Sequence, residues 1–250
     1  ALSNLGETDR RLIARVCETI VSGQRLDLLR FEGPQGVVQS LKDESELHDY
    51  TWRVAGCVGL FWTDLAEAHV QGWRSAEIEA MQAHARRYGM GLQRLNLIRD
   101  SAADLSQNRC YWPQSQLAQV GLNPVTLAQA VANRDTKALA LMTPLMAEGL
   151  QEIRHDLSLG LAYAQSVRPW RLRWASALPA LIGLRTVQAI EEAGTRVWFE
   201  PVKVPRSWVR ALLFRLLWAG WTRGGLRAIG RELGASGVCF LPAADGTITP

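Results

Sequence analysis

The segment GMGLQRLNLIRDSAADLSQNRCYWP, residues 89–113, combines a polar stripe with an apolar helical background. Its polar side chains follow one another at steps of three, four and four residues, which places them on one face of an α-helix. They are Gln93, Asn96, Asp100 and Asp104. Leucine and isoleucine fill many of the positions between them. We therefore predict a helix packed inside the protein, with its polar face turned toward a site.

The two aspartates of this stripe lie one helical turn apart, so both carboxylates can bind one hard cation. Mg²⁺ prefers a few carboxylate oxygens and shares its remaining positions with water and substrate phosphates. Arginines nearby suit phosphate oxygens, which they bind in a bidentate manner. The predicted metal ligands are Asp100, Asp104 and Asn96, and the predicted substrate-binding residues are Gln93, Arg99 and Arg109. Paired aspartates are also common on solvent-facing helices, and spacing alone leaves that interpretation open.

Helical periodicity extends over most of the chain. Apolar residues recur every three or four positions in seven ranges. The ranges are 8–32, 44–69, 75–105, 125–133, 136–166, 170–194 and 205–233. The one candidate strand, 197–204, contains Pro201, which cannot donate a ladder hydrogen bond. The pattern predicts an all-α protein with one domain over residues 1–235 and an irregular tail over 236–250.

The composition argues against several classes of protein. Four cysteines and four histidines lack C-x-x-C and H-E-x-x-H spacing, so neither a disulfide framework nor a usual zinc site is indicated. No run reaches the roughly 18 apolar residues that a membrane-spanning helix needs. The first residues do not resemble a signal peptide. We expect a cytoplasmic protein.

Basic residues are concentrated in the second half of the chain. Between residues 168 and 231, twelve Lys and Arg stand against three Glu, a local net charge of +9. Residues 207–234 combine arginines with tryptophan and leucine, which fits a helix lying on a membrane surface. A core helix with outward arginines fits equally well. No nucleic-acid recognition motif accompanies these residues, so nucleic acid is not an expected partner.

The stripe of residues 93–104 and the segment after it resemble a known family pattern. The pattern is Q-x-x-N-I-x-R-D-x-x-x-D followed by G-R-x-(Y/F)-(W/L)-P, the second aspartate-rich motif of the squalene and phytoene synthases. This chain carries the same order from Gln93 to Asp104, then Asn108-Arg109-Cys-Tyr111-Trp112-Pro113. Ala103 stands where the family often has Glu, which leaves one acid fewer.

Three further segments resemble this family in collinear order, so the resemblance covers about residues 15–215. Residues 50–59, YTWRVAGCVG, are similar to the family pattern Y-C-x-x-V-A-G-x-V-G. Residues 22–28, SGQRLDL, are similar to the family's G-M-x-x-D-L turn. Residues 178–209 are similar to the family's C-terminal helices and the K-V-x-R that follows them. The small residues of 50–59 fit two interpretations, close helix packing and room for a prenyl chain. The resemblance implies Tyr50 at the reaction centre.

Three basic residues in these segments are candidates for binding phosphate. Arg53 lies nearly one helical turn from Tyr50, and it can equally pair with Asp49 or Glu46. Lys203 and Arg206 can bind a phosphate of substrate or cofactor, or they can form a basic exposed turn.

The resemblance implies an all-α isoprenoid synthase bundle around a deep apolar cavity. It further implies a Mg²⁺-dependent head-to-head condensation of two prenyl diphosphates, with NADPH as a candidate second cofactor. The family's first aspartate-rich motif is absent upstream. We expect either a chain that lacks its N-terminal helices or a degenerate member.

The substrate follows less directly from the residues. Trp112 matches the squalene synthases, where phytoene synthases usually have Leu, and this favours two farnesyl diphosphates. Two geranylgeranyl diphosphates, giving phytoene, are the alternative. A second alternative is a non-catalytic relative that acts as an assembly factor. Retention of Tyr50, Asp100 and Asp104 favours the enzyme, whereas the missing first motif favours the assembly factor.

Overall fold

The computed structural model describes residues 5–34, 36–219, 222–237 and 241. The described helices are α1 (Glu7–Arg30), α2 (Glu44–Thr51), the π-helical turn η2 (Trp52–Gly56), α3 (Cys57–His69), α4 (Ile78–Ser106), α5 (Gln114–Gln119), α6 (Pro124–Ala132), α7 (Thr136–Ala140), α8 (Thr143–Ser166), α9 (Trp170–Ala193), the 3₁₀ turn η3 (Gly194–Trp198), α10 (Arg206–Ala219) and α11 (Arg223–Glu232). The all-α prediction is confirmed. Two strands of two residues, β1 (Gln39–Ser40) and β2 (Arg109–Cys110), pair in parallel and were not predicted.

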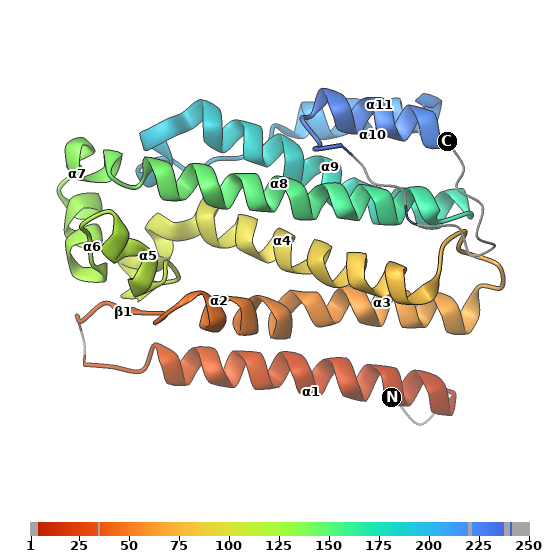
Figure 1. The fold of residues 1–250 in the computed structure, drawn as a ribbon, viewed down its shortest axis with the longest axis horizontal. Helices are drawn as coiled ribbons and strands as arrows, with labels where there is room; N and C mark the ends of the chain where they lie inside the picture. Colours follow the sequence, from red (N-terminus) through yellow and green to blue (C-terminus); the bar gives the residue numbers. More distant parts are fainter. Residues whose placement is uncertain (1–4, 35, 220–221, 238–240, 242–250) are drawn as a thin grey trace.

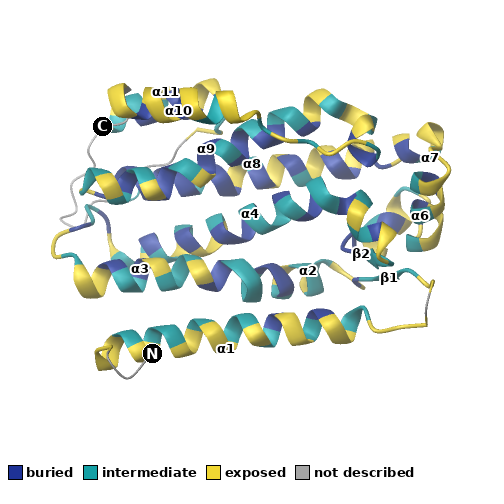
Figure 2. Ribbon diagram, turned by 180° about the vertical axis from the view of Figure 1, so that it is seen from behind, coloured by how far each residue is buried: buried dark blue, intermediate teal, exposed yellow. Residues whose placement is uncertain are grey.

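Two long helices, α4 and α8, form the centre of the bundle (Figure 1). Helix α9 packs on the other side of α8, while α2 and α3 pack on α4 and carry α1 on their outer side. The largest apolar cluster joins α4, α8 and α9, and its fully buried members include Leu157, Leu181 and Leu184. Helix α1 is mostly exposed, as Figure 2 shows, and only Gly23 and Asp27 on it are buried.

Local residues explain where the helices start. The Asp43 carboxylate accepts hydrogen bonds from the backbone N–H groups of Ser45 and Glu46 and so caps α2. Asn123 and Thr126 form a capping box at α6, with Pro124 in the first turn, where no N–H is required. These caps agree with the predicted starts near residues 44 and 125.

Two predicted helices are each divided in the structure. The range 136–166 splits into α7 and α8 because Pro144 lies in the first turn of α8 and cannot supply the N–H that a continuous helix needs. The range 205–233 splits into α10 and α11, and the Thr222 side chain caps α11 by accepting from the N–H of Gly225. The prediction of one continuous helix was wrong in both cases.

The candidate strand 197–204 does not form. Val197 and Trp198 end the 3₁₀ turn η3, and the residues from Pro201 to Pro205 follow as irregular chain. Proline at both positions removes backbone donors, which explains why no ladder develops. Of the predicted tail 236–250, residues 238–240 and 242–250 lie outside the described residues. Among the described helices, none has both the length and the apolar character needed to cross a bilayer.

Candidate functional site

The predicted polar stripe lies on α4, one helix of 29 residues. Gln93 and Asn96 line an apolar hollow of about 440 Å³ between α3, α4, α8 and α9. Its apolar walls include Val54, Ala55, Val58, Leu92 and Pro179. Asp100 and Asp104 follow on the same helix toward its C-terminal end, and both are half-buried. The structure thus places two carboxylates next to an apolar hollow with an amide rim.

Asp100 is held by its neighbour in the chain. Nε and Nη2 of Arg99 donate to the two carboxylate oxygens of Asp100 over 2.8 and 2.6 Å. Both residues line a second groove of about 640 Å³, whose opposite wall is the segment from Val197 to Val204. Arg99, predicted to bind substrate, therefore pairs with a predicted metal ligand in this structure.

Asp104 lies in a negatively charged environment that the nearby arginine does not fully neutralise. Burial, together with the nearby carboxylates of Asp100 and Asp27, raises the pKa of its carboxyl to about 6 against the opposing charge of Arg109. A carboxylate destabilised by like charges gains from any cation that binds beside it. The electrostatics of Asp104 are therefore suited to a positively charged ligand.

Asp27 completes this acidic cluster and was not predicted as a site residue. It is buried on the otherwise exposed α1, and it accepts a hydrogen bond from the Tyr111 hydroxyl over 2.8 Å. Nη1 of Arg109 lies 3.4 Å from its other carboxylate oxygen. Burial raises the pKa of Asp27. Its segment, residues 22–28, lies within α1, in agreement with the helix predicted over residues 8–32. The resemblance of residues 22–28 to a family motif pointed to Asp27. The distance along the chain between Asp27 and Asp104 gave no indication that the two residues meet.

The loop after α4 brings Arg109 and Tyr111 to this cluster. Asn108 adopts a left-handed backbone with φ of 62°, a conformation that asparagine tolerates better than most residues and glycine best. The family pattern has glycine at this position. The next two residues pair with Gln39 and Ser40 in the β1–β2 ladder, which fixes the direction of the loop.

Tyr50 is buried at the end of α2, where its ring lies 5.1 Å from the ring of Tyr111, centroid to centroid. Burial raises the pKa of the Tyr50 hydroxyl, the charges of Asp27 and Asp104 raise it further, and the Tyr111 and Gln93 side chains oppose this shift. The hydroxyl therefore keeps its proton at neutral pH. The structure brings Tyr50 together with Gln93, Arg109 and the acidic cluster.

The small residues of 50–59 allow close helix packing, and room for a prenyl chain beside them stays a prediction. A Cβ on Gly59 would lie 2.1 Å from the carbonyl oxygen of Ala85, and one on Gly89 would lie 2.5 Å from that of Ala55, so α4 packs backbone to backbone here. Ala55, Val58 and Gly59 also line the hollow. The π-helical turn η2 interrupts the helix at this place, which we did not predict.

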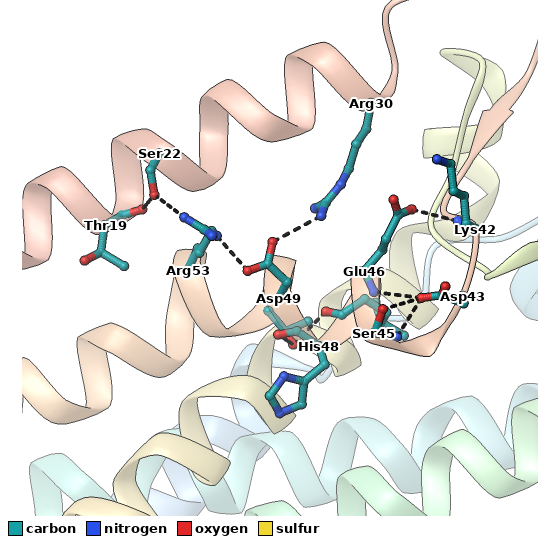
Figure 3. A network of polar contacts seen from close by, with 12 residues as sticks. Thr19, Ser22, Arg30, Lys42, Asp43, Ser45, Glu46, His48, Asp49 and Arg53 are labelled. Atoms are coloured by element: carbon teal, nitrogen blue, oxygen red, sulfur yellow. Dashed lines mark hydrogen bonds and ion pairs between the residues drawn. The ribbon is translucent and has the colours of Figure 1, made fainter.

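Arg53 extends between α1 and α2, as Figure 3 shows. Its Nε donates to Asp49 over 2.7 Å and its Nη1 donates to the Ser22 hydroxyl over 2.9 Å. Arg30 binds the same carboxylate over 3.1 Å. The pairing with Asp49 is thus the one that forms, and a phosphate-binding role for Arg53 stays a prediction.

Lys203 and Arg206 are both exposed. Lys203 lines the second groove opposite Arg99 and Asp100, so the fold brings it to the predicted site. Arg206 begins α10 and is not among the residues that line this groove. A role for either in binding phosphate stays a prediction.

The donors on α4 fit one part of a divalent cation site. Asp100 and Asp104 are hard oxygen ligands with excess negative charge around Asp104, and Asn96 is one turn away. Within the described residues, no three His, Cys, Asp or Glu side chains form a complete metal cluster. A cation here would complete its coordination with water and a phosphate ligand.

Comparison with known proteins agrees with this geometry. The family model for squalene/phytoene synthase matches residues 1–209. The chain belongs to the squalene/phytoene synthase family. Enzymes of this family are prenyltransferases that act on prenyl diphosphates.

Curated relatives within the squalene/phytoene synthase family include two bacterial 15-cis-phytoene synthases. The one from Enterobacter agglomerans is 30% identical over 149 residues, which is 60% of this chain and 45% of the relative. The one from Pantoea ananas is 27% identical over 173 residues, 67% of this chain and 51% of the relative. The chain therefore spans about half the length of these relatives.

Solved structures of the family share the fold. A complex of TcSQS with the ligand E5700 gives a TM-score of 0.71 at 21% identity, covering 92% of this chain and 63% of the other. Squalene synthase HpnC from Alicyclobacillus acidocaldarius gives a TM-score of 0.57 at 19% identity. That match covers 72% of this chain and 60% of the other. The predicted isoprenoid synthase fold is confirmed.

Proposed function

We propose that this protein joins two prenyl diphosphates head to head in a Mg²⁺-dependent reaction. The observation that carries the proposal is the position of Asp100 and Asp104 on α4, directly after the amides of Gln93 and Asn96 on the rim of an apolar hollow. The hollow suits a hydrocarbon chain and the carboxylates suit a metal that binds its diphosphate. Family membership supports the reaction class.

In such a reaction one substrate loses pyrophosphate and becomes an allylic cation. The double bond of the second substrate attacks it, and loss of a proton closes a cyclopropylcarbinyl diphosphate. Asp100, Asp104 and Asn96 would hold Mg²⁺, which when bound neutralises charge on the departing pyrophosphate. Apolar walls of the hollow exclude the water that would trap the cation.

The basic residues of the site have defined places in this scheme. Arg109 lies near Asp27 and Asp104, and in this scheme it binds diphosphate oxygens. When a cation binds the carboxylate of Asp100, Arg99 can release Asp100 and bind a diphosphate oxygen instead. Lys203 approaches from the opposite wall of the second groove. The protonated hydroxyl of Tyr50 can donate to a diphosphate oxygen.

We favour two farnesyl diphosphates as substrates, on the evidence of Trp112. Its indole Nε1 donates to the buried hydroxyl of Ser101 over 3.1 Å, so this residue is part of the packing behind α4. The squalene branch would add NADPH as reductant. Geranylgeranyl diphosphate is the second candidate, because the curated relatives above are phytoene synthases.

Product analysis tests the proposal. The complete protein is incubated with Mg²⁺, NADPH and farnesyl or geranylgeranyl diphosphate, and the extract is examined by mass spectrometry. We expect a C30 product that requires Mg²⁺, and losses of about a hundredfold or more in Asp100→Asn and Asp104→Asn. Asp135→Asn at the N-cap of α7 is the matched control, because asparagine caps a helix as well as aspartate does.

Other outcomes of this experiment have distinct meanings. A C40 polyene would overturn the farnesyl assignment and support the phytoene alternative. No Mg²⁺-dependent product from either substrate would overturn the enzymatic proposal and favour the non-catalytic assembly factor.

The exposed face of α10 supports a proposed contact with an anionic membrane. Four large apolar residues, Leu213, Phe214, Leu217 and Trp218, are exposed at helical spacing, and Trp218 is 89% exposed. Arg206 and Arg210 continue the same face, and α10 contains no acidic residue. Apolar side chains beside cations fit a surface of anionic lipids. The expected cytoplasmic location stays a prediction.

Vesicle flotation tests this contact. The protein should float with phosphatidylserine vesicles and much less with phosphatidylcholine alone. The pair Phe214→Ser and Trp218→Ser should abolish flotation, whereas Val125→Ser and Leu141→Ser, at exposed apolar positions on α6 and before α8, should not. Failure of the wild type to bind anionic vesicles would overturn the proposal.

A further inference from the structure

The part of the hollow that lies farthest along α4 from the carboxylates is walled by aromatic side chains. Trp62 of α3, Tyr88 of α4 and Tyr163 of α8 line it, together with Ala85 and Ser176. On α4, Tyr88 precedes Gln93 by more than one turn and Asp100 by more than three. A hydrocarbon chain that enters beside Asn96 and runs along α4 meets this aromatic wall.

Two of the aromatic side chains are fixed by the same residue of α9. The indole Nε1 of Trp62 donates to the Ser176 hydroxyl over 3.2 Å, and the Tyr88 hydroxyl donates to the Ser176 carbonyl over 3.0 Å. The Ser176 hydroxyl in turn donates to the carbonyl of Leu172 over 2.9 Å. These bonds tie α3, α4 and α9 together across the end of the hollow.

Tyr88 has little freedom to move away. A Cβ on Gly160 of α8 would lie 2.5 Å from Cδ2 of Tyr88, so the ring lies directly against a backbone without a side chain. Burial raises the pKa of its phenol, which therefore remains a donor. A ring wedged between Gly160 and the Ser176 carbonyl cannot swing aside without losing this part-buried hydrogen bond.

The third aromatic residue is the most buried of the three. Tyr163 is fully buried, and its hydroxyl accepts a hydrogen bond from the Thr63 hydroxyl over 3.2 Å. The ring also lies 6.1 Å from that of Trp73, centroid to centroid. Every aromatic side chain of this wall is thus hydrogen-bonded to another element of the bundle.

We propose that Trp62, Tyr88 and Tyr163 limit the length of the prenyl chain, so that the hollow accepts a C15 chain and excludes a C20 chain. This inference rests on the proposed function and names the substrate of that site. One isoprene unit adds four main-chain carbons, about 5 Å at C–C bonds of about 1.5 Å, close to the rise of about 5.4 Å per helical turn. The extra unit of a geranylgeranyl chain therefore needs about one more turn of α4, which the wall occupies.

Replacing a wall residue tests the inference. In Tyr88→Ala, the space against Gly160 opens, and the ratio of C40 to C30 product from a mixture of the two diphosphates should rise at least tenfold. Tyr88→Phe keeps the ring and loses only the hydroxyl, so the wild-type ratio should persist. Trp62→Leu is a second variant in case Tyr88→Ala does not fold. Trp62 is 38% exposed, so its replacement costs less folding stability than that of a fully buried residue.

Binding gives a readout that does not depend on turnover. Farnesyl and geranylgeranyl thiodiphosphates, which ionise slowly, are compared as ligands by thermal shift with Mg²⁺. The wild type should bind the C15 analogue better, and Tyr88→Ala should lose that preference. A wild type that makes C30 product while both variants keep its ratio would overturn the inference and leave the proposed function standing. A wild type that binds neither analogue and makes no product would overturn both.

Discussion

The hydroxyl of Tyr111 donates a hydrogen bond to Oδ1 of Asp27 over 2.8 Å and joins the loop after α4 to α1. The two residues are 84 positions apart, and Asp27 is the only charged residue of α1 that is buried. Through this bond the outermost helix of the bundle contributes to the acidic cluster around Asp104.

A double-mutant cycle should detect this bond as coupling between Tyr111 and Asp27. Tyr111→Phe and Asp27→Ala should show a coupling free energy of about 1–3 kcal/mol in denaturant unfolding, because a hydrogen bond to a charged acceptor is lost in either variant. Asp27→Asn is the matched control, since it keeps an acceptor oxygen at the same place. Strictly additive effects of the two changes would contradict the prediction.

Glycine-to-alanine substitutions on α3 and on α11 should change the free energy of unfolding in opposite directions, because only the glycine on α3 is packed closely against another helix. Gly59→Ala should lower the free energy of unfolding by about 1–3 kcal/mol, because its Cβ would meet the Ala85 backbone oxygen. Gly224→Ala on α11 has open space and should raise it by about 0.5–1 kcal/mol through helix propensity. The comparison is made by urea unfolding, and equal effects at both positions would refute it.

Removal of the Tyr50 hydroxyl should affect the second half of the reaction most. Tyr50→Phe keeps the ring contact with Tyr111 but removes the hydroxyl that lies beside Tyr111 and Gln93. We expect the cyclopropyl diphosphate to accumulate, with its ratio to final product raised about tenfold or more. Quantitative mass spectrometry of quenched reactions measures the ratio, which would stay at the wild-type value if the hydroxyl had no such role.

Stability should depend on pH through Glu67. Its carboxylate accepts from Arg74 and from the buried Trp73 indole, and these bonds lower the pKa of Glu67. A lowered folded pKa means that the stabilisation is present above the ordinary value of 4.5 and is lost as pH falls through the folded value. Glu67→Gln should thus lower stability by about 1 kcal/mol near neutral pH, a Tm shift of about 2–4 °C.

The Tm difference between Glu67→Gln and wild type should shrink as the pH is lowered to about 3, where the wild-type carboxylate takes up its proton. Differential scanning fluorimetry over this pH range provides the measurement. A Tm difference that is the same at every pH would show that the charge of Glu67 contributes nothing.

Much of the site could be predicted because it follows one helix. The steps from Gln93 to Asp104 are local, and helical geometry alone puts these side chains on one face. Asn108, Tyr111 and Trp112 follow on the loop after the same helix, so their order in the chain was enough to recognise the pattern. The positions of Arg53 and Arg99 were less predictable, because each pairs with an aspartate that competes with any phosphate.

By itself, the sequence determined the helical class, the polar stripe on α4 and the family pattern around it, because these depend on residues within a few turns of one another. Only the tertiary structure decided that Asp27 joins the cluster, that Arg53 donates a hydrogen bond to Ser22 of α1, and that Ser176 fixes an aromatic wall. Those contacts link residues on different helices. They depend on how backbones meet at positions such as Gly59 and Gly160, a result of packing rather than of local periodicity.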